Sequence, residues 1–192
     1  IHGITRQKKQ LGLGHAVSCA RAVVGNEPFA VMVGDDFITG DGAGLEQLVQ
    51  TAEKYNMPVV GGMEVPADLT NRYGMVKGDE IADGVFRISE MVEKPAVGTT
   101  DARLAIVGRY VLPPDLFNYL SNSEPGYGGE LQLTDSLAAM AKDRGMLAVR
   151  MKGTRFDAGD WVDYLCANIF FGLRDESLRA ALREKLQQLS LM

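Results

Sequence analysis

The sequence is poor in cysteine and contains no long apolar run. Its 192 residues include 2 cysteines, Cys19 and Cys166, which are too few and too far apart for a disulfide framework, a CxxC redox motif or a zinc site. No apolar run approaches the length of a transmembrane helix. The N-terminus also lacks the apolar region of a signal peptide, so a cytoplasmic location is expected by default.

An excess of positive charge is also lacking. The 20 basic and 25 acidic residues give a net charge of −5. This balance argues against a chain-wide attraction to nucleic acid or to an anionic membrane, and neither partner is expected. A length of 192 residues and a hydrophobic fraction of 46% are typical of a single globular domain. We therefore expect one domain over residues 1–192, in which residues 174–192 form a C-terminal helical extension.

The stretch from Phe29 to Asp36 combines a short apolar run with two carboxylates. Five apolar residues are followed by Gly34 and then by Asp35 and Asp36. A short, uninterrupted apolar run predicts a strand buried on both faces of a parallel sheet. In open α/β sheets, ligands bind beyond the carboxyl ends of the strands, where paired carboxylates suit Mg²⁺ held together with phosphates. A plain surface turn is the alternative, since aspartate is common in turns.

The remaining pattern alternates strands with helices. Apolar positions at helical spacing in residues 45–55 lie between the strand at 29–33 and a further one at 59–65, which is the order of a parallel βαβ unit. The expected fold class is therefore α/β. Further strands are predicted at 72–76, 86–93, 104–112 and 147–151, and further helices at 15–24, 115–120, 131–144, 161–173 and 178–191.

Charged or glycine-rich points recur where these predicted strands end. Besides Asp35, they include Gly74, Glu93-Lys94, Glu130 and Asp157. A glutamate can accept hydrogen bonds from hydroxyls, a lysine can neutralise phosphate and an aspartate can bind a metal, so the set suits a sugar phosphate. Each point also has an ordinary structural interpretation: Glu93-Lys94 as a solvated ion pair, and Asp157 as the cap of the following helix.

Several motifs, taken in order, resemble the bacterial UTP–glucose-1-phosphate uridylyltransferase family. The resemblance covers the chain up to about Leu173. The motifs that carry it are Arg6-Gln7, Leu11-Gly12-Leu13-Gly14-His15-Ala16, Val33-Gly34-Asp35-Asp36, Arg72-Tyr73-Gly74, Val92-Glu93-Lys94-Pro95, Leu104 to Tyr110, Gly128 to Asp135 and Phe156 to Asp160.

The resemblance implies a Rossmann-like nucleotidyltransferase fold, with a mixed, mostly parallel sheet flanked by helices. It implies an Mg²⁺-dependent enzyme that makes UDP-glucose and pyrophosphate from UTP and glucose 1-phosphate. On the nucleotide side, it implies that Gln7 and the backbone at Gly12 read the uracil edge. Asp35 and Asp157 would hold the Mg²⁺, while Asp36 is expected to be a supporting or turn residue.

On the sugar side, the resemblance implies that the backbone at Gly74 and the carboxylate of Glu93 bind glucose hydroxyls. Lys94 would contact the phosphate of the sugar. Glu130 lies in the sugar-side motif of the family and is a further candidate for substrate binding. The catalytic set implied in this way is Lys94, Asp35 and Asp157. The family also forms dimers or tetramers, so a homodimer or homotetramer is expected, with the apolar C-terminal helices as candidate contact surfaces.

The chain departs from the family pattern at its start. The family opens with a glycine-rich loop that cradles the UTP phosphates, and no such stretch precedes Arg6. An N-terminally incomplete domain is therefore expected, and the chain alone is expected to be inactive. Two alternatives stay open: another sugar-1-phosphate nucleotidyltransferase, of the thymidylyl type, and a non-catalytic binding or assembly subunit with the same fold.

Overall fold

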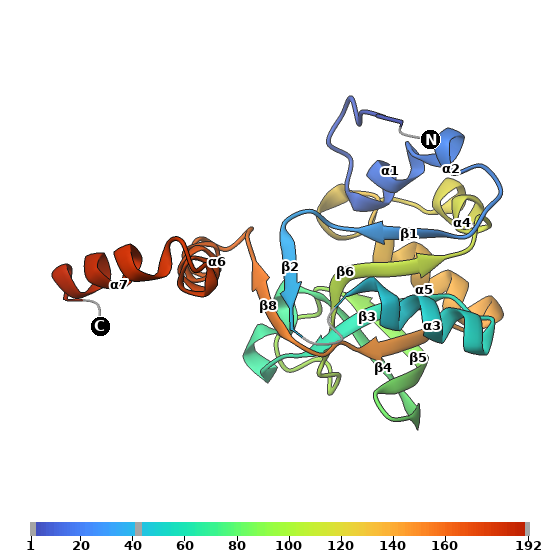
Figure 1. The fold of residues 1–192 in the computed structure, drawn as a ribbon. Coiled ribbons are helices and arrows are strands. Elements are labelled where there is room, and N and C mark those ends of the chain that lie inside the picture. The colour runs from blue at the N-terminus through green and yellow to red at the C-terminus, as the bar shows by residue number, and fades with distance from the viewer. Residues whose placement is uncertain (1–2, 41–43, 191–192) are drawn as a thin grey trace. The chain divides into compact units, whose positions relative to one another are not determined.

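The chain forms two compact units. A computed structural model describes residues 3–40 and 44–190. We call the first unit, which comprises Ile1–Val33 and Gly40–Gly153, the sheet unit, and the second, which comprises Gly34–Thr39 and Thr154–Met192, the ribbon unit. Figure 1 shows the elements of both.

The sheet unit is built on a mixed sheet. Within the described residues its strands are hydrogen-bonded in the order β1-β6-β3-β7-β5-β4. The bounds are β1 Phe29–Met32, β3 Val59–Glu64, β4 Gly74–Ala82, β5 Val85–Glu93, β6 Leu104–Leu112 and β7 Leu147–Arg150. The α/β class and the mixed sheet expected from the sequence are confirmed.

The expectation that this sheet is mostly parallel is wrong for the described strands. The pair β3–β7 is parallel, whereas β6 runs antiparallel to β1, β3 and β4, and β5 runs antiparallel to β4 and β7. The β1–α3–β3 unit does keep both strands in one direction, as the sequence order predicts. Strand β6 is inserted between them, because it returns from later in the chain and pairs with both.

Helices cover both faces of this sheet, as expected. Helix α3 (Leu45–Tyr55) contacts β3, β6 and β7, whereas α5 (Leu133–Arg144) contacts β5. In Figure 1, α3 lies in front of the sheet and α5 behind it. The main core lies on the α5 side, where α1 (Leu13–Ser18) and α4 (Leu116–Asn122) also pack. The smaller helical elements are α2 Arg21–Val24, η1 Ala67–Arg72 and η2 Tyr127–Gly129.

Strand β1 differs from its prediction. Its residues are alternately half-buried and exposed, so it is not buried on both faces. Phe29 packs into the main core, where its ring stacks on that of Phe117 with 5.2 Å between centroids. Met32, on the other face, is 58% exposed. The physical reason is position: β1 has one strand neighbour, β6, among the described strands.

The ribbon unit joins two segments that lie far apart in the sequence. Strand β2 (Asp36–Thr39) pairs antiparallel with β8 (Thr154–Asp157), and α6 (Trp161–Arg174) and α7 (Arg179–Gln188) follow. The side chain of Asp160 caps α6 by accepting the backbone N–H groups of Val162 and Asp163. The sequence predicts both helices but neither strand of the ribbon. Across the described residues, every helix is too short or too polar to cross a membrane.

Candidate active site

Gly74 and Glu93 face each other where two strands of the sheet unit meet. Gly74 opens β4 and Glu93 closes β5, and the two are paired in register. A Cβ atom at position 74 would lie 2.7 Å from Thr134 Oγ1 and 3.0 Å from Glu93 Oε2. A side chain at position 74 would therefore have to displace Thr134 or Glu93, whereas glycine leaves its backbone and the Glu93 carboxylate side by side. The structure thus brings together two residues that the sequence assigns to sugar hydroxyls.

Lys94 follows Glu93 directly and has an unusual backbone conformation. Its φ is 43°, in the left-handed region that non-glycine residues rarely adopt. Its N–H donates to the Tyr73 carbonyl at 3.1 Å, which continues the pairing of β4 with β5 by one residue beyond Gly74 and Glu93. The ammonium Nζ lies 4.0 Å from Glu93 Oε1 and 5.3 Å from the ring centroid of Tyr127. Within the described chain Nζ makes no hydrogen bond, so its donors are available to a ligand.

The glycine loop at Gly12 and Gly14 is held against the segment around Leu131. Gly14 N donates to Leu131 O at 2.9 Å, and Leu131 N donates to Leu11 O at 2.8 Å. Gly12 has a φ of +98°, and a Cβ there would lie 2.7 Å from Leu131 O. Glycine is therefore needed at this position both for conformation and for space.

Gln7 is anchored to this loop through its amide nitrogen. Nε2 donates to Gly12 O at 3.0 Å and lies 2.8 Å from His15 Nδ1. Both partners engage the nitrogen, and no described residue bonds the carbonyl oxygen Oε1. The two residues to which the family resemblance assigns the nucleobase, Gln7 and Gly12, are thus in direct contact, and the Gln7 carbonyl oxygen is left as an acceptor.

Glu130 lies beside the glycine loop as well. A Cβ at Gly12 would come within 2.8 Å of Glu130 Cβ. The buried Gln132 donates from Nε2 to Glu130 Oε2 at 3.3 Å and to Tyr127 O at 3.0 Å. Gln132 therefore links Glu130 to the segment that carries Tyr127, whose ring in turn contacts Lys94. The sequence motif at Glu130 and the one at Glu93-Lys94 are connected through these residues.

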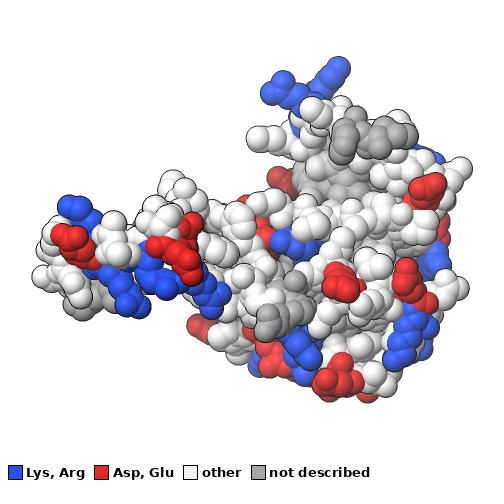
Figure 2. Space-filling model, in the orientation of Figure 1, with Lys and Arg blue, Asp and Glu red and all other residues white. Residues whose placement is uncertain are grey.

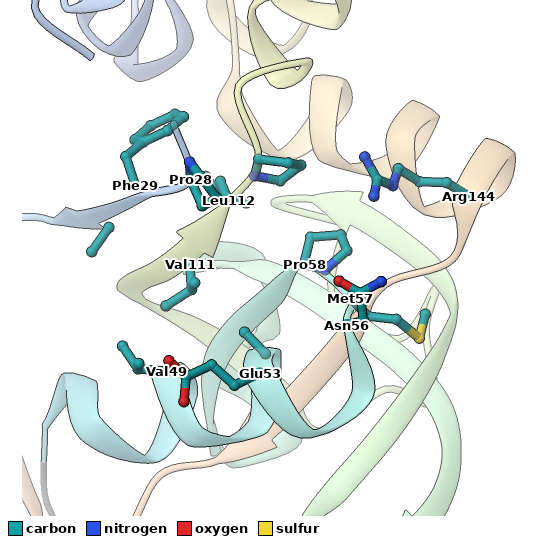
Figure 3. A pocket seen from close by; sticks show the side chains of 13 residues that line it. Pro28, Phe29, Val49, Glu53, Asn56, Met57, Pro58, Val111, Leu112 and Arg144 are labelled. Carbon is teal, nitrogen blue, oxygen red and sulfur yellow. The ribbon is translucent and has the colours of Figure 1, made fainter. Parts of the chain in front are cut away.

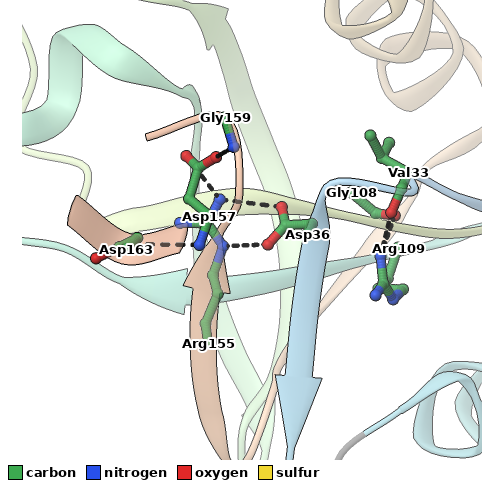
Figure 4. Close-up of polar contacts among 8 residues, drawn as sticks. All are labelled: Val33, Asp36, Gly108, Arg109, Arg155, Asp157, Gly159 and Asp163. Atoms are coloured by element: carbon green, nitrogen blue, oxygen red, sulfur yellow. Dashed lines mark hydrogen bonds and ion pairs between the residues drawn. The ribbon is translucent and has the colours of Figure 1, made fainter. Parts of the chain in front are cut away.

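In the ribbon unit, Asp35 and Asp157 border a common space next to Gly159. Ala158 N donates to Asp35 O at 2.7 Å, and Gly159 N donates to Asp157 Oδ1 at 3.0 Å. A Cβ at Gly159 would lie 3.0 Å from Asp157 Oδ1 and 3.8 Å from Asp35 Oδ2. Figure 4 shows Asp157, Gly159 and their neighbours. The two residues that the sequence assigns to the metal are therefore neighbours.

Asp36, which the sequence predicts to be a supporting or turn residue, forms an ion pair with Arg155. It is the first residue of β2, it is buried, and its carboxylate accepts two hydrogen bonds from Arg155, at 2.5 Å from Nε and 3.0 Å from Nη2. Arg155 Nη2 also lies 3.5 Å from Asp157 Oδ2 (Figure 4). Arg155 is absent from the sequence prediction. The signal was the spacing of Arg155 and Asp157, two residues apart and hence on one face of a strand.

The donor set in the ribbon unit fits a magnesium ion bound together with phosphates. Mg²⁺ is typically held by one or two carboxylates plus substrate phosphates and water, and only rarely by an all-protein cage. Asp35 and Asp157 supply two carboxylates that approach the same space. The described residues contain no group of three or more His, Cys, Asp or Glu side chains suited to a metal. Two carboxylates are the number expected when the ion is held together with phosphates, and they are too few for an all-protein cage.

One open pocket lies away from these residues. It has a volume of about 380 Å³ and lies between β1, α3 and β6, lined by Ala30, Val49 and Val111 among others (Figure 3). No candidate site residue lines it. On the face drawn in Figure 2, basic and acidic side chains are interspersed, without one dominant basic patch. Neither feature adds a residue to the candidate site.

Sequence comparison places the chain in a known class. Residues 2–172 match the nucleotidyl transferase family, and the chain belongs to that family. It is 46% identical over 169 residues to the UTP–glucose-1-phosphate uridylyltransferase of Pseudomonas aeruginosa, covering 86% of this chain and 60% of the relative. It is 40% identical over 186 residues to UTP–glucose-1-phosphate uridylyltransferase 2 of Staphylococcus saprophyticus, covering 97% of this chain and 64% of the relative. The resemblance seen in the motifs is confirmed.

Comparison with solved structures agrees with the sequence comparison. A UDP-glucose pyrophosphorylase complexed with UDP-glucose superimposes with a TM-score of 0.87 at 37% identity, over 90% of this chain and 66% of that one. The UTP-bound enzyme from Acinetobacter baumannii superimposes with a TM-score of 0.85 at 34% identity, over 96% and 64%. The nucleotidyltransferase fold is confirmed. The chain spans 60% to 64% of the length of the two curated relatives.

Proposed function

We propose that the protein carrying this chain transfers a uridylyl group from UTP to glucose 1-phosphate, giving UDP-glucose and pyrophosphate. The observation that carries the proposal is the pairing of Glu93 and Lys94 beside Gly74. There an acid suited to hydroxyls adjoins an ammonium whose donors are not used by any described residue. The relatives named above are uridylyltransferases, and one was solved with UDP-glucose, which supports the same reaction.

On the sugar side, Glu93 and Gly74 would bind the glucose ring, and Lys94 its phosphate. The Glu93 side chain is 12% exposed and that of Lys94 is 37% exposed, so the acid is the more enclosed of the two. A carboxylate accepts hydrogen bonds from hydroxyls, and an ammonium forms charge-assisted bonds to a phosphate. Glu130 lies in a segment that Gln132 links to this region and is a further candidate.

On the nucleotide side, Gln7 would bind the base through its remaining acceptor. Because Nε2 is engaged by Gly12 O and lies next to His15, the carbonyl Oε1 is the group left for a ligand. A carbonyl oxygen pairs with a ring N–H donor such as N3–H of uracil. The positive-φ backbone at Gly12 would pass close to the base for the same reason that it passes close to Leu131: it carries no side chain.

Asp35 and Asp157 are the residues that would hold Mg²⁺. Bound there, the ion would supply positive charge to the phosphates of the nucleotide. The protein's own task is then positioning. An oxygen of the glucose 1-phosphate attacks the α-phosphorus of UTP in line, pyrophosphate leaves, and the two anions must be brought together against their repulsion. Lys94 offsets that repulsion by donating to the attacking phosphate.

Replacing Lys94 tests the proposal. In the full-length protein, Lys94→Ala is expected to slow turnover and to raise KM for glucose 1-phosphate more than KM for UTP. A hydrogen bond to a charged group is worth about 1.5–3 kcal/mol, so kcat/KM for glucose 1-phosphate should fall by about 10- to 100-fold. Lys77→Ala is the matched control, because Lys77 is exposed and already paired with Asp101. Equal kinetics for Lys94→Ala and the parent would remove Lys94 from the site.

The thymidylyl alternative is compatible with the contact proposed for Gln7. Its Oε1 acceptor suits N3–H of uracil and of thymine equally, so this contact does not distinguish UTP from dTTP. A panel of nucleoside triphosphates with glucose 1-phosphate separates the two, and preference for dTTP would replace the proposal. Titration calorimetry with UDP-glucose addresses the non-catalytic alternative: absence of binding by the full-length protein would favour it.

We also propose that the protein acts as a homodimer or homotetramer in the cytoplasm. The apolar residues Trp161, Leu165 and Ile169 follow one another at four-residue spacing on α6 and are 80%, 59% and 39% exposed. Such a stripe suits burial against a second copy. Light scattering of the parent and of Leu165→Glu tests this, since the charged variant should dissociate. A monomeric parent would contradict it.

A further inference from the structure

We propose that Tyr127 is a positioning residue for Lys94, whose ammonium it holds against its ring face so that the N–H donors stay available to the sugar phosphate. The inference rests on the proposed role of Lys94. The sequence motifs do not include Tyr127, and it lies in a glycine-rich loop that the sequence indicates only as a connection. The ring centroid lies 5.3 Å from Lys94 Nζ, within the range of a cation–π contact.

The backbone of Lys94 is held in place, whereas its side chain is flexible. Its backbone is held by the bond from Lys94 N to Tyr73 O and by the left-handed φ of 43°. Its side chain has a flexible four-carbon stem, which carries about 2 kcal/mol of rotamer entropy. The contacts that the structure gives to Nζ are the Glu93 carboxylate at 4.0 Å and the Tyr127 ring. Without the ring, Glu93 alone would restrain the ammonium.

The tyrosine is held by its own backbone. Its carbonyl accepts from Gln132 Nε2 at 3.0 Å and from Glu130 N at 3.5 Å. Gly128 and Gly129 follow with φ values of 70° and 73°, which turn the chain tightly after the ring. The ring is 57% exposed, so core packing does not account for it. An aromatic side chain on an anchored loop, with one face towards a lysine, is suited to placing that lysine.

A ring contact has an advantage over a hydrogen bond for this purpose. A lysine has three N–H donors and no acceptor. A carboxylate at hydrogen-bond distance would take up one of these donors and much of the charge, whereas the ring quadrupole attracts the ammonium without accepting a conventional hydrogen bond. Glu93 at 4.0 Å and Tyr127 at 5.3 Å therefore restrain Nζ from two residues while leaving its donors free.

Kinetics of two substitutions test the inference in the full-length protein. A cation–π contact at an exposed site is worth about 0.5–1 kcal/mol, so Tyr127→Leu should raise KM for glucose 1-phosphate about two- to fivefold. KM for UTP should stay unchanged, and kcat should fall by a smaller factor than in Lys94→Ala, because Tyr127 acts only through Lys94. Tyr127→Phe keeps the ring and should behave as the parent. Tyr55→Leu is the matched control, since Lys54 lies over Tyr55 at 5.0 Å in a similar pair outside the site.

A double substitution separates positioning from direct contact. In a Lys94→Ala background, Tyr127→Leu should have no further effect on KM for glucose 1-phosphate. A persisting effect would mean that Tyr127 touches the substrate itself, and the inference would be overturned. A loss in Tyr127→Phe equal to that in Tyr127→Leu would also overturn it, because the hydroxyl would then be responsible.

A substrate-free measurement distinguishes failure of this inference from failure of the proposed function. After reductive ¹³C-methylation of the lysines, which preserves their charge, the Lys94 methyl signal should be shifted by the ring current of Tyr127. The shift should vanish in Tyr127→Leu and persist in Tyr127→Phe. A shifted signal together with unchanged kinetics in Lys94→Ala would refute the role of Lys94. An unshifted signal would refute the contact itself.

Discussion

The mostly buried ion pairs of the β2–β8 ribbon lead to a prediction about how Asp157 is held. Arg155→Met keeps an apolar stem but removes the guanidinium, which bonds both oxygens of Asp36 and lies 3.5 Å from Asp157 Oδ2. The substitution leaves two carboxylates, paired in register across the ribbon, without a cation between them. We therefore expect the ribbon to open far more easily.

The size of the effect follows from burial. The side chains of Arg155 and Asp36 are 13% and 9% exposed. Removing one partner of a buried ion pair costs about 3–5 kcal/mol. The Asp157 side chain is 22% exposed, so water can solvate part of the uncompensated charge. We therefore expect the cost to lie at the lower end of that range, about 3 kcal/mol. Since 1.4 kcal/mol is a factor of ten, amide hydrogen exchange in β2 and β8 should accelerate about a hundredfold.

Amide hydrogen exchange measured segment by segment checks this prediction. Arg144→Met is the matched control, because Arg144 and Asp115 form a similar pair whose side chains are 40% and 42% exposed. A pair with that exposure is worth at most about 1 kcal/mol, so exchange near Arg144 should rise by no more than about fivefold. Acceleration below fivefold in the ribbon of Arg155→Met would refute the reasoning. Arg155→Lys should fall between parent and Met variant, since it keeps the charge but loses the planar fork.

Two further substitutions in the sheet unit have defined outcomes. Gly74→Ala places a Cβ 3.0 Å from Glu93 Oε2 and 2.7 Å from Thr134 Oγ1, so it should weaken glucose 1-phosphate binding, measured by calorimetry, more than UTP binding; equal effects on both would contradict it. Burial raises the pKa of the Asp135 carboxyl above its ordinary value of 3.8, so its charged form is disfavoured on folding. The free energy of unfolding should therefore fall as the pH rises from 3.8 through the raised pKa, and Asp135→Asn should remove that decline in urea unfolding; an unchanged pH profile would count against it.

Elements with strong local patterns were predicted closely from the sequence. Helix α3 spans Leu45–Tyr55, the bounds that its apolar spacing predicts, and its Leu48 is fully buried. Strand β6 spans Leu104–Leu112, again as predicted. In both cases the residues that decide the structure are within one element, so periodicity and the flanking residues carry enough information.

The ribbon could not be predicted in the same way. Strands β2 and β8 have four residues each, and residue 36 pairs with residue 157. Nothing near either segment indicates the other, and the Gly-Asp-Asp sequence considered alone suits a surface turn and a metal site equally. The strand order could not be predicted for the same reason. Strand β6 lies between β1 and β3 only because it pairs with both from far along the chain. Such pairings depend on tertiary contacts that local propensity does not encode.

The residues of the candidate site also differ in how far the sequence predicts them. Glu93, Lys94 and Gly74 were predicted because they sit at recognisable strand ends and in motifs that resemble those of the family. Tyr127 was missed, since its place beside Lys94 depends on a loop whose conformation is fixed by Gln132. Residues that act through a neighbour in space leave a weaker trace in the sequence than residues that carry the chemistry.

Two glycines show how the chain keeps its acids open to a ligand. At Gly74, a Cβ would meet Glu93 Oε2 at 3.0 Å, and at Gly159 a Cβ would meet Asp157 Oδ1 at 3.0 Å. One lies in the sheet unit and the other in the ribbon unit, and neither has a positive φ that would require glycine. Conformation therefore does not explain these residues, whereas the limited space beside a carboxylate oxygen, and at Gly74 also beside Thr134 Oγ1 at 2.7 Å, is consistent with glycine. A glycine of ordinary φ next to an acid is the feature that the proposed sugar and metal sites share.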